Sequence, residues 1–147
     1  MPTEYRAPPG VITGMNRNPK IELLAGVPLF SHLSKRDLAE IAAIADEVDL
    51  PAGSTLTREG HSGREFVVLA AGIADVERAG KRVNTLGPGD FLGEISLVTG
   101  RPRTATVTTR SPARAFVLSA PAFRTLIRRA PRIRTSVLAT AALRLSE

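Results

Sequence analysis

Between Asp46 and Leu118 the sequence breaks into short apolar stretches separated by glycine or proline turns. These stretches cover residues 47–50, 54–57, 65–70, 73–77, 82–86, 105–109 and 113–118. Strands this short, with turns this frequent, are typical of a compact antiparallel roll, sandwich or barrel. A parallel sheet would need crossover helices, and the turns are too short to hold them. We therefore predict a mainly β fold with flanking helices, built on an antiparallel, jelly-roll-like β-roll.

Helical patterns precede this β region. We expect a short helical segment in residues 20–30 and a clearer helix that starts after Ser34, a candidate N-cap, and runs to Ala45. Residues 1–18 contain several prolines and glycines with little periodicity, which is typical of a flexible leader. The chain is therefore expected to consist of a leader, 1–18, and one folded domain, 19–147.

Two more helices are expected after the β region. Ser119 is a candidate N-cap for a helix over residues 121–129, and Pro131 is expected to break or bend the chain there. A second amphipathic helix follows, because apolar residues recur at i, i+4 spacing. This apolar stripe consists of Ile133, Val137, Ala141 and Leu145, and it could pair with a second copy of the chain as easily as fold back on the roll.

Composition excludes several classes of protein. A chain of 147 residues can bury a core as one domain, and its lack of cysteine excludes a disulfide framework, a thiol nucleophile and a cysteine zinc site. The same lack favours a reducing, cytoplasmic setting. No apolar run approaches the roughly 18 residues that span a bilayer, and the N-terminus lacks an apolar signal-peptide core. We expect no contact with membranes.

The net charge of +6 is concentrated at the C-terminal end. Residues 101–147 contain 10 arginines and a single acidic residue, whereas residues 1–100 contain 10 basic and 13 acidic residues. Such a stretch could attract nucleic acid, an acidic partner or a small anion. The simplest interpretation is a solvated helix face with one or two arginines turned towards a ligand. Nucleic acid is not the expected partner, because the chain has no Trp and only one Tyr with which to stack bases.

Residues 86–103, LGPGDFLGEISLVTGRPR, interrupt the rhythm of the strands with a short helical pattern. The helix is expected to begin at Gly93 and Glu94, and its first N–H groups, which lack partners inside the helix, carry the positive end of the dipole. Helix starts of this kind bind anions. Arg103 lies one short loop later, and its planar guanidinium can hold a phosphate through two hydrogen bonds.

Glu94 is unusual beside an anion site because a carboxylate repels phosphate. It is explained if the ligand also offers a hydroxyl donor, and a ribose 2′-hydroxyl next to a phosphate meets both demands. Glu94 also suits a helix start simply as a complement to the dipole. Arg103 alone would more often be a surface residue of a strand. The anion-site hypothesis therefore depends on their combination with Gly93.

Residues 89–107, GDFLGEISLVTGRPRTATV, resemble the phosphate-binding cassette of the cyclic-nucleotide-binding domain family. This family includes catabolite-activator-type regulators, kinase regulatory subunits and cyclic-nucleotide-gated channels. The matching positions are Gly89, Asp90, Phe91, Gly93, Glu94, Arg103, Ala105 and Val107. The resemblance extends beyond the cassette, since helices flank the roll on both sides and the family's β-roll has turns at the positions of Gly53, Arg58, Glu59, Gly60 and Gly72. About residues 20–146 are covered.

The resemblance implies a role for each cassette residue. Glu94 would accept a hydrogen bond from the ribose 2′-hydroxyl, and Arg103 would pair with the cyclic phosphate. The full set of expected ligand-binding residues is Gly93, Glu94, Ile95, Ser96, Arg103, Thr104 and Ala105. Thr104 matches a position where the family carries Ala, Ser or Thr, and a hydroxyl there occurs in binders of cyclic AMP and of cyclic GMP. Since bacterial-type members mostly use cyclic AMP, that ligand is expected, with cyclic GMP as the alternative and no further cofactor.

No helix-turn-helix, kinase or channel segment follows the cassette, so we expect a stand-alone sensor that regulates an unidentified protein, with a fragment of a longer regulator as the alternative. The sensor could form a homodimer through its C-terminal helix. Only 16 residues follow Pro131, so the helix that covers the base in relatives is expected to be short or absent. Thr135, Ser136 and Thr140 are candidate base contacts. The alternative function is a basic C-terminal face that binds nucleic acid or an acidic protein, with a vestigial nucleotide site.

Catalysis is not expected. Gly87, Gly89 and Gly93 are spaced one residue away from the dinucleotide fingerprint and lack its βαβ context. His32 and His61 are isolated in the sequence, whereas a metal-binding β-barrel enzyme would need clustered histidines.

Overall fold

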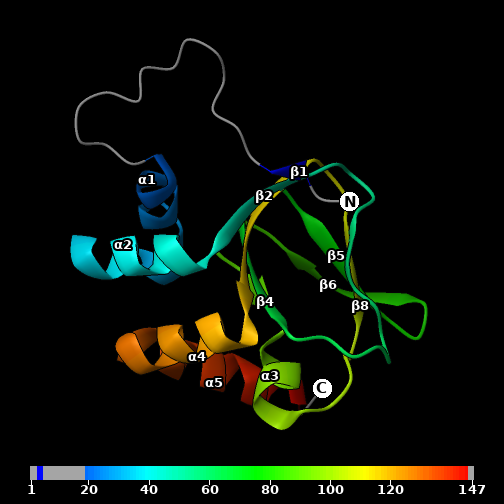
Figure 1. Ribbon diagram of the computed structural model, residues 1–147. Helices are drawn as coiled ribbons and strands as arrows, with labels where there is room; N and C mark the ends of the chain where they lie inside the picture. Colours follow the sequence, from blue (N-terminus) through cyan, green and yellow to red (C-terminus); the bar gives the residue numbers. More distant parts are fainter. Residues whose placement is uncertain (1–2, 5–18, 146–147) are drawn as a thin grey trace.

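The computed structural model describes residues 3–4 and 19–145, of which Thr3, Glu4 and Leu145 are described by their backbone alone. Two antiparallel sheets curl into a roll, with helices gathered on one side of it (Figure 1). One sheet has the strand order β1-β2-β9-β4-β7 and the other the order β3-β8-β5-β6. The mainly β roll with flanking helices that the sequence predicts is confirmed.

The bounds of the elements follow the predicted stretches closely. The strands are β1 (Thr3–Glu4), β2 (Asp46–Leu50), β3 (Thr55–Thr57), β4 (Glu65–Ala71), β5 (Ala74–Arg78), β6 (Lys81–Leu86), β7 (Phe91–Leu92), β8 (Thr106–Thr109) and β9 (Ala113–Ser119). The helices are α1 (Pro19–Ala25), the 3-10 helix η1 (Pro28–Phe30), α2 (Lys35–Ile44), α3 (Glu94–Thr99), α4 (Ala120–Arg129) and α5 (Pro131–Leu145).

Two strands were not expected. β7 has only two residues, too few to show a period of two, and it pairs with β4. β1 pairs with the edge of β2, so Thr3 and Glu4 are extended where the sequence predicts a flexible leader. The rest of that predicted leader, residues 1–2 and 5–18, lies outside the described residues.

β4 carries the core because it is buried on both faces. Phe66 and Val68 point towards the helices, whereas Val67 and Leu69 point into the roll. This arrangement explains why the strand is an unbroken apolar run rather than an alternating one. The helix side of the core also contains Phe91, which lies 5.4 Å from the Phe66 ring between centroids.

The helix ends expected from the sequence are confirmed. The hydroxyl of Ser34 accepts a hydrogen bond from the backbone N–H of Asp37 at the start of α2. The hydroxyl of Ser119 does the same for Ala122 at the start of α4. α4 ends at Arg129, two residues before Pro131, and α5 begins at that proline. The chain therefore turns at Ala130, whose φ of −126° and ψ of 84° lie outside the helical region that a following proline disfavours.

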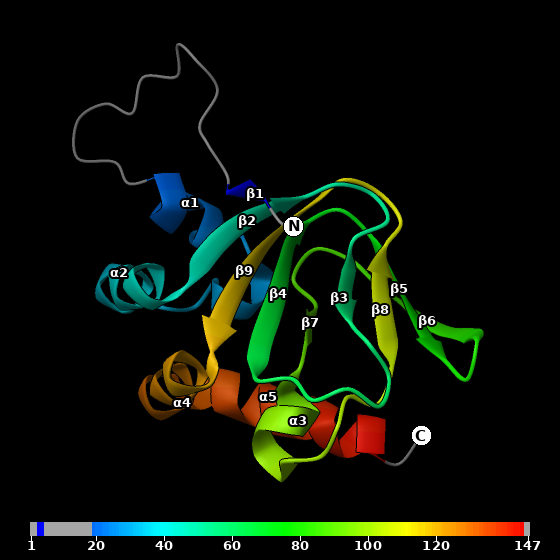
Figure 2. The same ribbon diagram turned by 45° about the vertical axis from the view of Figure 1, so that its right-hand side comes forward.

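α5 folds back on the molecule. Ile133 and Val137 are fully buried against the helix side of the core, and Ala141 is also buried. The apolar stripe therefore packs on its own chain, which is one of the two arrangements that the sequence leaves open, the other being pairing with a second copy. In Figure 2 the red end of α5 runs beneath the open end of the roll and passes α3. None of the helices within 3–4 and 19–145 is long and apolar enough to cross a membrane.

This packing predicts different effects of alanine at two positions of α5. Ile133→Ala should lower the free energy of unfolding by about 2 to 5 kcal/mol, because it leaves a cavity at a site with 0% exposure. Leu138→Ala, on the same helix but with 49% exposure, should change it by less than about 0.5 kcal/mol. Urea denaturation of both variants measures the difference. Equal losses would contradict the packing of α5.

Candidate functional site

A pocket opens at the end of the roll, between α3 and the β5–β6 hairpin. It encloses about 600 Å³ of empty space, part of which is open to solvent. The seven residues expected to bind a ligand all line it: Gly93, Glu94, Ile95, Ser96, Arg103, Thr104 and Ala105. The structure therefore brings the predicted residues together around one pocket.

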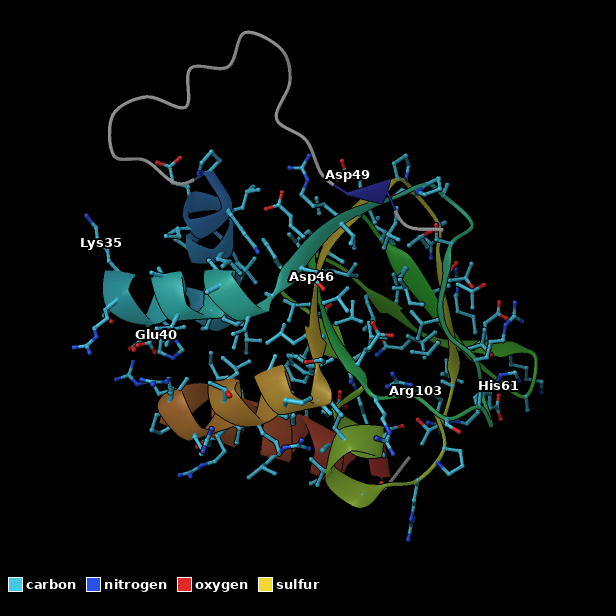
Figure 3. The ribbon with its side chains drawn as sticks, in the orientation of Figure 1. Lys35, Glu40, Asp46, Asp49, His61 and Arg103 are labelled. Atoms are coloured by element: carbon cyan, nitrogen blue, oxygen red, sulfur yellow. The ribbon has the colours of Figure 1, made fainter. Side chains whose placement is uncertain are left out.

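Arg103 is held in place by the loop between β3 and β4. Its backbone N–H donates to the carbonyl of His61 at 2.8 Å, and its carbonyl accepts from the N–H of Gly60 at 2.8 Å. Its Nη2 donates to the carbonyl of Glu65 at 3.0 Å. Figure 3 shows Arg103 above α3, with His61 farther out. Both the backbone and the side chain of Arg103 are thus fixed by a segment some 40 residues earlier in the chain.

Two glycines make room for the guanidinium. A Cβ on Gly63 would lie 1.9 Å from Nε of Arg103, so any side chain there would displace the arginine. A Cβ on Gly93 would lie 2.2 Å from the carbonyl oxygen of Glu65 and 2.7 Å from Nη1 of Arg103. Gly93 also has a φ of 96°, which side chains disfavour. The sequence predicts a role for Gly93 but points to none for Gly63.

The charge of Arg103 is incompletely compensated. Its side chain is 7% exposed, its Nη1 is buried without a hydrogen-bond partner, and it forms no ion pair within 3–4 and 19–145. Burial lowers the pKa of the guanidinium, although the charges of Glu65 and Glu94 oppose the shift. Arginine nevertheless stays protonated at neutral pH. The pocket therefore holds a buried cation with a free donor, and an anion would stabilise it.

Glu94 presents the complementary group. Its side chain is 1% exposed, and its Oε1 accepts a hydrogen bond from Nη1 of Arg144 at 2.6 Å. Its Oε2 is buried and has no partner among the residues that the structure describes. A buried carboxylate oxygen without a donor is costly. The pocket therefore also offers a free acceptor, and a ligand hydroxyl could satisfy it.

Arg144 was missed by the sequence analysis. It lies in the last turn of α5, and besides Glu94 it donates from Nη2 to the carbonyl of Phe91 at 2.8 Å. Its guanidinium carbon also lies 5.4 Å from the centre of the Phe91 ring, a cation–π distance. The sequence indicated that one or two of the C-terminal arginines would face a ligand, but nothing in the pattern distinguished Arg144 from the others.

The C-terminal helix reaches the pocket despite its short length. Arg144 lines the pocket, whereas Thr135, Ser136 and Thr140, the candidate base contacts on this helix, do not. The hydroxyl of Thr135 donates instead to the carbonyl of Pro131 within the helix. α5 therefore contributes to the site through a charged residue at its end rather than through hydroxyls along its surface.

No metal site accompanies this pocket in the described part of the chain. Nowhere in 3–4 and 19–145 do three or more histidine or carboxylate side chains gather closely enough to hold an ion. The site combines a buried arginine with a free donor, Arg103, and a buried carboxylate with a free acceptor, Glu94.

Comparison with protein families identifies the same region. Residues 47–130 match the family model of the cyclic nucleotide-binding domain. The chain is also 37% identical over 90 residues to a cAMP-dependent protein kinase regulatory subunit of Aspergillus niger. That match covers 60% of this chain and 22% of the relative, so the chain spans about a fifth of the length of the curated relatives it matches.

Solved structures share the fold. The regulatory subunit of a cAMP-independent protein kinase A from Trypanosoma brucei superposes with a TM-score of 0.75 at 20% identity, over 84% of this chain and 46% of that one. The regulatory domain of Toxoplasma gondii protein kinase A, crystallised with cAMP, gives a TM-score of 0.70 at 20% identity, over 85% and 49% of the two chains.

The ion pair between Glu94 and Arg144 predicts a stability difference within α5. Arg144→Ala should lower the free energy of unfolding by about 3 kcal/mol, because it leaves the buried carboxylate without its cation. Arg134→Ala removes the same charge from the exposed surface of the helix and should cost less than about 0.5 kcal/mol. Urea denaturation compares the two variants. If Arg144→Ala is as mild as Arg134→Ala, the pair does not hold the end of α5.

Proposed function

The chain belongs to the cyclic nucleotide-binding domain family, and from this premise we propose that its pocket binds cyclic AMP in preference to cyclic GMP and serves as a sensor. One observation carries the proposal. Nη1 of Arg103 and Oε2 of Glu94 are both buried, lack partners in the described part of the chain, and line the same pocket. A ligand with an anionic oxygen and a neighbouring hydroxyl would satisfy both.

A ribose 3′,5′-cyclic phosphate is such a ligand. Its phosphate would accept from Nη1 of Arg103, and its 2′-hydroxyl would donate to Oε2 of Glu94. Arg144 leaves this arrangement possible, because it occupies Oε1 and not Oε2. The remaining cassette residues would complete the site with the backbone of Gly93, Glu94 and Ile95 around the phosphate, and with Ser96, Thr104 and Ala105 along the walls.

The proposed preference for cyclic AMP over cyclic GMP concerns the base and not the sugar or phosphate. The Toxoplasma gondii domain was crystallised with cAMP, whereas the Trypanosoma brucei kinase is described as cAMP-independent. Proteins with this fold thus differ in their response to cAMP, so the fold alone does not determine the ligand. Thr104, whose side chain is exposed at the pocket, suits either purine.

The wider role follows from the binding site. We propose that residues 19–147 form the sensor domain, that it binds without catalysis, and that it regulates a cytoplasmic protein. A homodimer through α5 would have to use the outer face of the helix, where Leu138 is half exposed, because the inner stripe is buried in the chain itself.

The alternative, a basic C-terminal face that binds nucleic acid or an acidic protein, has less support. Arg103 is buried, Arg129 pairs with Glu40, and Arg144 pairs with Glu94, so these arginines do not contribute free charge to that face. A vestigial pocket also does not explain the buried Arg103, whose unpaired donor costs stability unless an anion binds to it. Phosphate-backbone binding would also weaken steeply as salt rises, whereas binding in the pocket should survive moderate salt.

The central role of Arg103 predicts a large loss of affinity. Arg103→Ala should weaken cyclic AMP binding by about 2 to 3 kcal/mol, since a hydrogen bond to a charged partner is lost. Arg101→Ala removes an exposed arginine two residues away and serves as the control. Titration calorimetry with cyclic AMP, cyclic GMP and 5′-AMP measures both variants and the wild type. A wild type that does not prefer cyclic over linear nucleotide would overturn the proposed function.

The space at Gly63 provides an independent test. Gly63→Ala should lower the affinity for cyclic AMP about tenfold or more, because the new methyl group must push the guanidinium of Arg103 aside. The fold should tolerate the change, since the contact is with a side chain. Gly87→Ala is the matched control, because a Cβ there meets no atom within 4 Å. Titration calorimetry gives the affinities, and thermal unfolding checks the fold. Equal affinities of the two variants would show that the position of Arg103 does not matter.

A further inference from the structure

The pocket is also lined by an arginine that the proposed function does not use. Arg78 is the last residue of β5, and its partly buried side chain lines the pocket. Val76, two residues earlier and therefore on the same face of the strand, packs against the apolar interior of the roll. Arg78 thus extends an inward-facing row of side chains to the pocket mouth.

One hydrogen bond positions the guanidinium of Arg78. Its Nε donates to the backbone carbonyl of Thr104 at 3.2 Å. Its two terminal nitrogens have no hydrogen bond or ion pair within 3–4 and 19–145. Since Thr104 directly follows Arg103, this bond places the Arg78 guanidinium beside the anion site, at the lining of the pocket.

The expected position of the sugar and phosphate determines what Arg78 can reach. With the phosphate on Arg103 and the sugar on Glu94, the part of the pocket left for the base is the β5–β6 wall. That wall is formed by Val76, Arg78, Val83, Asn84 and Leu86. It is mostly apolar, which suits the face of a base, and a guanidinium plane also packs well on such a face.

We propose that Arg78 is the base-contacting residue of this site, with its guanidinium plane packed on the face of the purine ring. The base subsite then lies on the β5–β6 hairpin and not on the C-terminal helix. This inference rests on the proposed function, because the sugar and phosphate define where the base lies. Arg78 then determines specificity, because it strengthens the binding of a ligand that carries a base and not the binding of the sugar and phosphate alone.

The test separates the base from the rest of the ligand. Arg78→Ala should weaken cyclic AMP binding about three- to tenfold, the scale of a cation–π contact at a partly exposed site. Binding of methyl riboside 3′,5′-cyclic phosphate, which has the same sugar and phosphate but no base, should change less than about twofold. NMR titration measures both ligands, including weak binding. Equal losses for both would mean that Arg78 acts on the phosphate, and no loss for cyclic AMP would also overturn the inference.

Two further variants control for charge. Arg82→Ala removes the same charge from the same hairpin, but Arg82 lies outside the pocket beside Asp75 and should leave the affinity unchanged. Arg78→Lys keeps the charge without the plane and should recover only part of the affinity that Arg78→Ala loses. If lysine restores wild-type affinity, charge and not stacking is responsible, and the inference fails. A wild type that binds neither ligand would instead refute the proposed function itself.

Discussion

The buried guanidinium of Arg103 is the constraint on which the rest of the site depends. A charge with so little exposure is costly, and the structure compensates only part of that cost through the carbonyl of Glu65. The loop between β3 and β4 fixes the backbone of Arg103, and the absence of side chains at Gly63 and Gly93 leaves room for it. The chain thus maintains a buried cation with one free donor, which is the property that an anion-binding site requires.

The second charged group connects the pocket to the end of the chain. Glu94 starts α3 and is bound by Arg144 from the last turn of α5, so the helix that closes the fold also orders the cassette. Packing of Ile133 and Val137 against the core positions α5 for this contact. The ion pair therefore joins the pocket to the C-terminal helix, which is the kind of link that the proposed sensor role requires.

Much of this structure could be predicted because its signals are local. The strands show short apolar runs between turns, Ser34 and Ser119 cap helices within three residues, and the cassette is one continuous segment. The features that the sequence did not reveal are contacts between residues far apart in the chain and an element too short to show a pattern. Arg144 contacts a residue 50 positions away and is one of many C-terminal arginines, and β7 has only two residues. The role of Gly63 is visible only when Arg103 lies against it.

The most direct measurement is a crystal structure of the protein with cyclic AMP. The account predicts a phosphate oxygen about 3 Å from Nη1 of Arg103 and the ribose 2′-oxygen about 2.7 Å from Oε2 of Glu94, both at hydrogen-bond distance. The ion pair between Glu94 and Arg144 should persist beside the ligand. A nucleotide bound with its phosphate away from Arg103, or bound outside this pocket, would contradict the account.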